Sequence, residues 1–251
     1  MAVVNRLEID IGLKRFAPVD RADEQIALKD VRLGVPSGAF VCVVGPSGCG
    51  KTTLLNIVAG LDRAFDGRID YGDNQVRPRI GYVFQEPRLL PWRTAGENIE
   101  LVLSHTGRDS GIVDELLAAT GLEKARHVYT NRLSLGMSRR VALARAFAVE
   151  PELLLMDEPF VSLDEATARQ LRLLLLDIWR ARPTTVLFVT HDLREAIALA
   201  DRIVILSPSP GSVLAEVSVD LPRDRRGDEA AIDAFRETLL RRQEAAFEGV
   251  D

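Results

Sequence analysis

The apolar positions of the chain form short continuous runs in three places, at residues 40–44, 153–156 and 185–189. Each run is followed by a turn and then by a segment with helical periodicity, at residues 52–59, 165–182 and 192–200. Continuous apolar strands separated by helices are typical of a parallel sheet that is buried on both faces. The pattern therefore predicts an α/β fold around a parallel core.

The N-terminal part has a different pattern. Residues 7–11 alternate between apolar and polar side chains, as a half-exposed antiparallel strand does. Residues 27–35 and 67–71 also predict short strands with turns between them. We therefore expect an N-terminal antiparallel β subdomain that forms an edge of the parallel core.

Between residues 86 and 148 the strand pattern stops, and three segments have helical periodicity, at residues 97–103, 112–120 and 138–148. This predicts an all-helical subdomain, residues 86–148, inserted into a catalytic core made of residues 1–85 and 149–223. A strand-like run at residues 213–219 and a charged segment lead to a C-terminal helix within residues 224–251. We treat the whole chain, residues 1–251, as one domain built from these parts.

Composition limits the classes of function. The chain has 251 residues, of which 47% are hydrophobic and 27% charged, which is ordinary for a globular protein. Its net charge of −5 argues against sequence-independent nucleic-acid binding, because that binding needs clustered lysine and arginine. No apolar signal segment and no run of about 18 apolar residues is present, so we expect neither secretion nor insertion into a membrane.

Residues 45–52 read G-P-S-G-C-G-K-T and fit the phosphate-loop pattern G-x-x-x-x-G-K-[ST] between a buried strand and a helix. Glycines let the backbone wrap a phosphate chain, and the helix N-terminus attracts its negative charge. We assign phosphate binding to Gly45, Pro46, Ser47, Gly48, Cys49 and Gly50. Lys51 is expected to reach the β- and γ-phosphates of ATP, Thr52 to coordinate Mg²⁺ and Thr53 to donate to the α-phosphate. A glycine-rich turn without a ligand is the alternative.

The two cysteines of the chain, Cys42 and Cys49, are too few for a disulfide scaffold and fit a reducing compartment. Cys42 lies on an apolar run, where packing in the core explains it. Cys49 lies within the phosphate loop, and we expect it to react with alkylating agents and to be protected by nucleotide.

The apolar run at residues 153–156 ends in two acids, Asp157 and Glu158. Desolvated carboxylates need partners, and beside a phosphate loop that partner is Mg²⁺. We expect Asp157 to hold the metal, directly or through water, and Glu158 to act as general base toward an attacking water. A helix N-cap is the alternative explanation of this pair.

Four further segments stand in a characteristic order along the chain. Gln85 follows the run at residues 81–84, and L-S-L-G-M-S-R-R-V occupies residues 133–141. S-L-D at residues 162–164 and V-T-H-D at residues 189–192 come after them. They resemble the Q-loop, the signature motif, the D-loop and the switch-histidine segment of the ATP-binding cassette (ABC) family. The resemblance covers essentially the whole chain. It implies a P-loop NTPase core, ATP hydrolysis and a dimer in which two cassettes enclose two ATP molecules head to tail.

Ser134 stands where an N-cap would open a helix beginning near Ser138, and with the Gly136 backbone it would form an anion site. In the family this site faces the nucleotide of the second subunit. Leu135 replaces the usual glycine and Met137 the usual glutamine, which bears on how tightly the sandwich closes. An ordinary N-capped helix is the alternative.

The resemblance also assigns the remaining site residues. His191 would contact the γ-phosphate and stabilise developing charge, and Gln85 would serve both catalysis and the metal. Asp164 of the D-loop joins the nucleotide-binding residues. Phe16 is the candidate for the aromatic ring that stacks on adenine, with a core or simply exposed phenylalanine as the alternative. The catalytic set is thus Lys51, Gln85, Glu158 and His191, and the metal set is Thr52, Gln85 and Asp157.

A single cassette without membrane helices is typical of bacterial importers. Residues 84–92, F-Q-E-P-R-L-L-P-W, closely resemble the Q-loop region of importers for nitrate, sulfonate, taurine and similar small solutes. The resemblance implies an ATPase subunit that sits peripherally on the cytoplasmic face of the cell membrane. Its partners would be a second copy of itself or a paralogous cassette, a separate permease and, indirectly, a solute-binding protein.

The apolar segment Leu89, Leu90, Pro91 and Trp92 is expected to receive a short helix of the permease, with Trp92 packed inside the helical subdomain as the alternative. Two other functions stay open. One is a weakly hydrolysing ABC regulatory or binding module, which Leu135 and Met137 favour. The other is a non-transport ABC ATPase acting on nucleic acid, against which the net charge of −5 argues.

Overall fold

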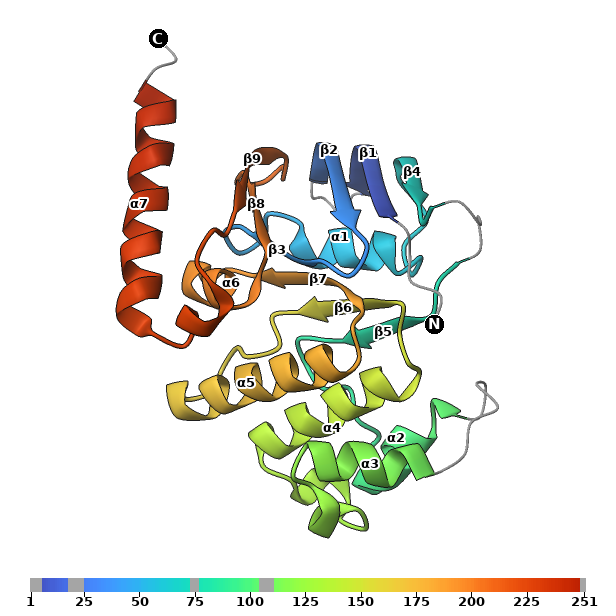
Figure 1. The fold of residues 1–251 in the computed structure, drawn as a ribbon. Coiled ribbons are helices and arrows are strands. Elements are labelled where there is room, and N and C mark those ends of the chain that lie inside the picture. Colours follow the sequence, from blue (N-terminus) through green and yellow to red (C-terminus); the bar gives the residue numbers. More distant parts are fainter. Residues whose placement is uncertain (1–5, 18–24, 73–76, 104–110, 249–251) are drawn as a thin grey trace.

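The computed structural model of the protein describes residues 6–17, 25–72, 77–103 and 111–248 (Figure 1). Within these residues the largest sheet has the strand order β5-β6-β7-β3-β8-β9. The strands are β5 (Ile80–Val83), β6 (Leu153–Asp157), β7 (Thr185–Thr190), β3 (Phe40–Val44), β8 (Arg202–Leu206) and β9 (Val213–Ser218). All neighbours are parallel except β9, which runs antiparallel to β8.

The three apolar runs that predict core strands are β3, β6 and β7, and every residue of these strands is buried. The α/β fold with a parallel core is therefore confirmed. β8 is an additional core strand that was not predicted, although residues 203–206 form an apolar run of the same kind. β9 alternates between half-buried and exposed residues, as expected of an edge strand with one covered face.

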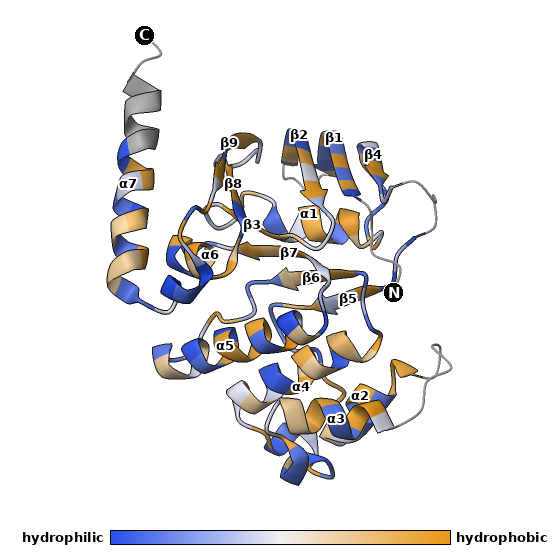
Figure 2. Cartoon of the chain, viewed as in Figure 1, coloured by the Kyte–Doolittle hydropathy of each residue, from blue (hydrophilic) through white to orange (hydrophobic). Residues whose placement is uncertain are grey.

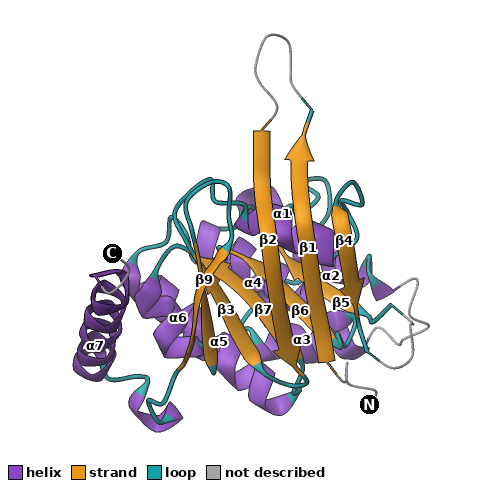
Figure 3. Ribbon diagram, turned by 90° about the horizontal axis from the view of Figure 1, so that it is seen from above, coloured by secondary structure: helices purple, strands orange, loops and turns teal. Residues whose placement is uncertain are grey.

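A second, separate sheet has the order β2-β1-β4 and is antiparallel. It is made of β1 (Arg6–Phe16), β2 (Gln25–Pro36) and β4 (Asp66–Asp70). The expectation that these strands form an edge of the parallel core is thus wrong. The helix α1 (Lys51–Val58) lies between the two sheets (Figures 1 and 3). Leu7, Ile9 and Ile11 of β1 share one apolar cluster with Leu54 and Leu55 of α1, and burying that face requires stacking rather than edge pairing.

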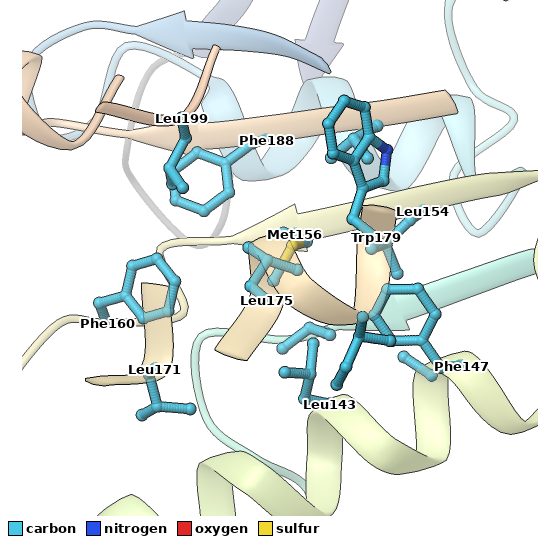
Figure 4. Close-up of a cluster of buried hydrophobic side chains, with 14 of the residues drawn as sticks. Leu143, Phe147, Leu154, Met156, Phe160, Leu171, Leu175, Trp179, Phe188 and Leu199 are labelled. Carbon is cyan, nitrogen blue, oxygen red and sulfur yellow. The ribbon is translucent and has the colours of Figure 1, made fainter. Parts of the chain in front are cut away.

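The opposite face of the six-stranded sheet is covered by α4 (Leu135–Ala148), α5 (Glu165–Ala181) and α6 (Leu193–Leu199). Figure 4 shows Phe147 of α4, Leu175 and Trp179 of α5, and Phe188 of β7 meeting in one apolar cluster. α2 (Ala95–Glu100) and α3 (Gly111–Ala119) pack against α4, on the side of the molecule away from β1, β2 and β4 (Figure 1). Short 3-10 turns are η2 (Glu123–Ala125), η3 (Thr130–Arg132) and η4 (Arg223–Arg225).

The described chain ends in α7 (Glu229–Glu248), which stands beside α6 (Figure 1). It is the helix predicted within residues 224–251, of which residues 249–251 lie outside the described part. In Figure 2 the interior strands β6 and β7 are coloured mainly as hydrophobic, whereas α5 and α7 contain both hydrophobic and hydrophilic residues. Among the described helices, none is both long and apolar enough to span a bilayer.

Candidate functional site

The phosphate loop lies where the sequence predicts it, between the buried strand β3 and α1. Gly50 is the N-cap of α1 with φ of +99°, and no side chain caps this helix end. A Cβ at Gly50 would lie 2.6 Å from Leu28 Cδ2 and 2.8 Å from the carbonyl oxygen of Ala27, so a larger residue does not fit. The backbone N–H groups that open α1 are therefore left without a side-chain partner and suit an anion.

The Lys51 ammonium is held across this loop. Its side chain is buried, and Nζ donates to the carbonyl oxygens of Gly45 at 2.8 Å and Pro46 at 3.0 Å. Nζ also lies 3.3 Å from Oε1 of Glu158. These oxygens satisfy its three donors, so a phosphate oxygen has to replace one of them in order to bind Lys51.

Asp157 ends β6 with its side chain 3% exposed. Its Oδ1 accepts a hydrogen bond from Thr52 Oγ1 at 3.2 Å. Burial raises the pKa of Asp157, and the Glu158 charge adds to this, while the Thr52 hydrogen bond and the Lys51 charge oppose it. A buried carboxylate with unused lone pairs is stabilised by a nearby cation.

Glu158 follows directly and has φ of +40°, in the left-handed region that non-glycine residues rarely adopt. Its backbone N–H donates to the Val189 carbonyl at 3.0 Å, which ties it to β7. Its Oε2 lies 2.9 Å from Nδ1 of His191, whose side chain is exposed. One carboxylate thus contacts Lys51 with one oxygen and His191 with the other. The positive φ of Glu158 costs about 1–3 kcal/mol, and strained backbone of this kind clusters at functional sites.

A cavity of about 290 Å³ lies between the phosphate loop, Glu158 and the strands β1 and β2. It is lined by Phe16, Gln25, Ala27, Ser47, Gly48, Gly50, Lys51, Thr52, Thr53, Gln85 and Glu158. Phe16 is 42% exposed and stands in this lining, so it is not a core residue. The cavity combines an aromatic ring, a phosphate loop and a strained carboxylate. A larger hollow of about 740 Å³ between β9 and α7 contains none of the predicted site residues.

The sequence predicts three residues as Mg²⁺ ligands: Thr52, Gln85 and Asp157. Among the residues that the structure describes, no three His, Cys, Asp or Glu side chains lie together as a metal site. Thr52 and Asp157 instead present two neighbouring oxygen atoms. Mg²⁺ is usually bound by one or two protein oxygens together with substrate phosphates and water, so this donor set fits Mg²⁺. Gln85 lies in the lining of the same cavity.

The signature segment lies elsewhere. α4 begins at Leu135 rather than near Ser138, because Ser134 Oγ accepts a hydrogen bond from the Met137 N–H at 3.2 Å. A Cβ at Gly136 would lie 2.9 Å from Thr167 Cγ2 in the first turn of α5. Asp164 caps that helix by accepting the Thr167 N–H at 2.9 Å. Ser134, Gly136 and Asp164 are thus gathered by the N-termini of α4 and α5, and none of them lines the cavity.

Cys49 corrects one expectation. Its side chain is fully buried, and a Cβ at Gly45 would lie 2.7 Å from its sulfur. Burial also raises the pKa of the Cys49 thiol, which keeps it protonated and unreactive at neutral pH. Alkylation that nucleotide suppresses is therefore not expected. Cys42 is buried in β3, in agreement with a packing role.

Comparison with known proteins decides the family. A family model described as ABC transporter matches residues 28–161. The chain belongs to the ABC transporter family. It is 44% identical over 220 residues to the aliphatic sulfonates import ATP-binding protein SsuB of Bacillus licheniformis, covering 85% of this chain and 86% of that protein. It is 41% identical over 233 residues to the nitrate import ATP-binding protein NrtD of Synechococcus elongatus, covering 88% and 84%.

A solved structure extends the comparison to assembly. A dimeric ATP-binding cassette in a post-hydrolysis state, bound to ADP and Pi, matches with a TM-score of 0.74 and 33% identity, covering 85% of this chain and 98% of that one. These findings confirm the predicted P-loop NTPase fold and the resemblance to ATPase subunits of sulfonate and nitrate importers. The chain is therefore an ABC ATPase of the importer branch.

Two arginines that the sequence analysis did not single out hold the Q-loop of this ABC protein. Arg139 of α4 is buried, and its guanidinium donates to the Gln85 carbonyl and, at 3.2 Å, to the Val161 carbonyl. Arg145 of the same helix donates to the carbonyls of Pro87 at 2.7 Å and Arg88 at 2.9 Å. Arginines among the apolar residues of a predicted helix, where a charged side chain needs a partner, are the signal that would have found them.

The segment after the Q-loop is ordered by Asn98, which is fully buried in α2. Its side chain accepts from the Leu90 N–H at 2.8 Å and donates to the Leu90 and Thr94 carbonyls at 3.2 and 2.9 Å. Trp92, two residues after Leu90, is 69% exposed. The alternative that Trp92 packs inside the helical part is therefore wrong, and the ring faces outward from a fixed loop.

Proposed function

We propose that this ABC ATPase energises the import of a small organic sulfonate or a nitrate-like anion through a separate permease. The observation that carries the catalytic part is the single cavity that combines Phe16, the phosphate loop and Glu158. The solute class rests on two relatives at 44% and 41% identity, which are import ATP-binding proteins for aliphatic sulfonates and for nitrate.

In the proposed reaction the adenine of ATP stacks on Phe16 and its phosphates lie along residues 45–53. Lys51 exchanges a loop carbonyl for a phosphate oxygen. Glu158 accepts a proton from the attacking water, whose oxygen forms the new bond to the γ-phosphorus as the bond to the ADP oxygen breaks. His191 orients Glu158 through the 2.9 Å contact and stabilises the charge that develops on the γ-phosphate.

Thr52 and Asp157, with Gln85, would hold Mg²⁺ in this site. The ion, when bound, neutralises phosphate charge during transfer. The Thr52 hydroxyl and the Asp157 carboxylate already lie 3.2 Å apart, so the donors need little rearrangement.

Ser134, Gly136 and Asp164 are proposed to act on the nucleotide of a second cassette. They lie together at the N-termini of α4 and α5 and outside the chain's own cavity. Two chains arranged head to tail would therefore complete two ATP sites. The dimeric state of the matching solved structure supports this arrangement.

The permease contact is proposed for the exposed segment from Gln85 to Trp92, with the protein peripheral on the cytoplasmic face of the membrane and a solute-binding protein acting through the permease. In this proposal residues 86–148 form the helical subdomain that carries the signature motif, and residues 1–85 and 149–223 form the catalytic core. In a reconstituted complex, Trp92→Ala should weaken assembly or transport more than basal ATPase activity. Equal losses would contradict a permease contact at Trp92.

The decisive experiment is Glu158→Gln. The amide keeps the shape of the side chain but cannot accept the proton, so steady-state phosphate release should fall by about 10²-fold or more. ATP binding should persist, and ATP should drive dimers that size-exclusion chromatography detects. Phosphate release at the wild-type rate in this variant would remove Glu158 from the role of base. A very low rate in the wild-type chain would instead favour a binding or regulatory module.

A further inference from the structure

Lys14 is a buried lysine beside the nucleotide cavity that neither the reaction nor the family motifs account for. It is 2% exposed, although lysine is almost never fully buried without a partner. Its ammonium lies 2.7 Å from one carboxylate oxygen of Asp62 and 2.9 Å from the other. It also donates to the carbonyl of Ala64 at 2.9 Å. Lys14 is therefore anchored by three oxygens.

The same ammonium faces an aromatic ring. Lys14 Nζ lies 4.6 Å from the ring centroid of Phe16, within the range of a cation–π interaction. Phe16 is otherwise a poorly fixed side chain, because it is the last residue of β1 and is 42% exposed. The charge of Lys14 thus gives the ring a defined neighbour on the protein side.

The anchor links β1, which carries Phe16, to the turn at the C-terminal end of α1. Asp62 and Ala64 belong to the turn that follows α1, and α1 begins at Lys51 in the phosphate loop. Phe16 and the phosphate loop line one cavity but lie on different sheets and helices. Lys14 belongs to β1 and is bonded to the turn after α1, so it ties the end of β1 that carries Phe16 to the helix that the phosphate loop opens.

We infer that Lys14 is a positioning residue, which holds the Phe16 ring at the height and angle that adenine stacking requires. This rests on the proposed stacking role of Phe16. Lys14 acts through Phe16 and touches no reacting atom, so its removal should weaken binding of the base and leave the chemical step alone. The hydrogen bond from Lys14 also helps keep the pKa of Asp62 below its usual value, so Asp62 is charged at neutral pH.

The test uses the full chain with the paired substitution Lys14→Met/Asp62→Asn, which removes both charges together and avoids an unpaired buried carboxylate. Binding of Mg-ATP, measured by calorimetry, should weaken about fivefold, the scale of one partly buried cation–π contact. Binding of inorganic tripolyphosphate, which has no base, should stay unchanged. The KM for ATP should rise by the same factor while kcat stays constant.

Three further variants make the result specific. Lys29→Met, the same substitution at an exposed lysine of β2, should change nothing. Phe16→Ala should weaken ATP binding, and adding the Lys14→Met/Asp62→Asn pair to Phe16→Ala should cost nothing more. Lys14→Arg keeps a cation over the ring and should restore most of the affinity. If the paired variant fails to give a normal melting curve, Asp62→Asn alone should show the same selective loss on a smaller scale.

Each contrary outcome has its own meaning. Equal weakening of ATP and tripolyphosphate would show that Lys14 merely supports the phosphate loop, which overturns the inference. Wild-type ATP affinity in the paired variant, with a loss in Phe16→Ala, would overturn the inference and leave the proposed function intact. An unchanged affinity in Phe16→Ala would overturn the proposed adenine contact itself.

Discussion

The N-termini of α1 and α4 are both glycine-containing helix starts assigned to phosphate binding, yet they are built differently. α1 begins after Gly50 in the left-handed conformation, and no side chain caps it. α4 begins after Ser134, whose own hydroxyl accepts the Met137 N–H. The first leaves its backbone donors for a ligand, whereas the second already satisfies one of them.

The residues around the two helix N-termini also differ. The α1 end lies in a cavity with Lys51, Thr52 and Glu158, and Lys51 already bonds the loop carbonyls. The α4 end is exposed at Ser134 and Leu135 and is braced by α5. One terminus thus lines a cavity of its own chain, whereas the other lies at the surface. In the proposed head-to-tail dimer, each cassette would supply the first terminus to its own ATP and the second to the ATP of its partner.

Among substitutions at these two helix starts, Gly50→Ala should have the largest effect, which is on ATP binding. The new Cβ would need φ of +99° and would lie 2.6 Å from Leu28 Cδ2, so the loop must open. ATP binding, measured by calorimetry, should weaken at least tenfold, or about 1.4 kcal/mol. Gly38→Ala is the matched control, because Gly38 also has positive φ but has open space around its Cβ position. It should lower the melting temperature without changing ATP affinity; an equal loss of affinity would contradict the role assigned to the phosphate loop.

Gly136→Ala probes the other terminus. Alanine favours the helix by up to about 1 kcal/mol, but its Cβ would lie 2.9 Å from Thr167 Cγ2 and push α4 away from α5. ATP binding by the monomer should be unchanged, and ATP-driven dimerisation and turnover should fall about fivefold.

Thr167→Ser supplies the rescue for this variant. Serine lacks the Cγ2 methyl and keeps the hydroxyl that bonds Asp164, so Gly136→Ala/Thr167→Ser should recover turnover. Failure to recover would mean that the small size of Gly136 serves the partner's nucleotide directly.

Asp157→Asn tests whether the α1 site carries a stability cost that the α4 site lacks. Burial raises the folded-state pKa of Asp157 above its unfolded value of about 3.9. Stability therefore falls as pH rises from the unfolded toward the folded pKa, and the loss persists at neutral pH. Asp157→Asn should melt higher than wild type at pH 7, and the difference should shrink as the pH is lowered toward 4. A lower melting temperature at pH 7 would mean that Thr52 and Lys51 outweigh burial.

The smallest effect is expected from Leu135→Gly. Leu135 is the first residue of α4 and is 43% exposed, so little apolar burial is lost. Glycine is the usual residue at this place in the family signature, and ATPase activity should be equal or higher. A large loss would show that the leucine contributes to closure across the dimer.

Local motifs predict the site well because each rests on neighbouring residues. The phosphate loop, Asp157 with Glu158, and His191 follow buried strands whose apolar runs are visible in the sequence, and parallel strands bring their carboxyl ends to one edge. Ser134 as an N-cap is likewise a local feature, although the helix starts three residues earlier than expected.

What the sequence did not reveal depends on register and on distant partners. Alternation along β1 predicts inward residues at every second position, and Leu7, Ile9 and Ile11 follow it. The pairing with β4 then shifts between Ile11 and Leu13, and Lys14 becomes buried. The positive φ of Glu158 and the contacts of Arg139 also depend on strands and loops far away in sequence.

The contacts of Arg139 bear on whether the helical part can be exchanged between related cassettes. Its guanidinium reaches Gln85 and Val161 through their carbonyl oxygens rather than through side chains. Any residue at those two positions offers the same acceptors, so the contacts of Arg139 place no restriction on the side chains there, and the link itself depends on the backbone alone. Helical blocks from related cassettes should therefore be exchangeable as long as each brings its own buried arginine.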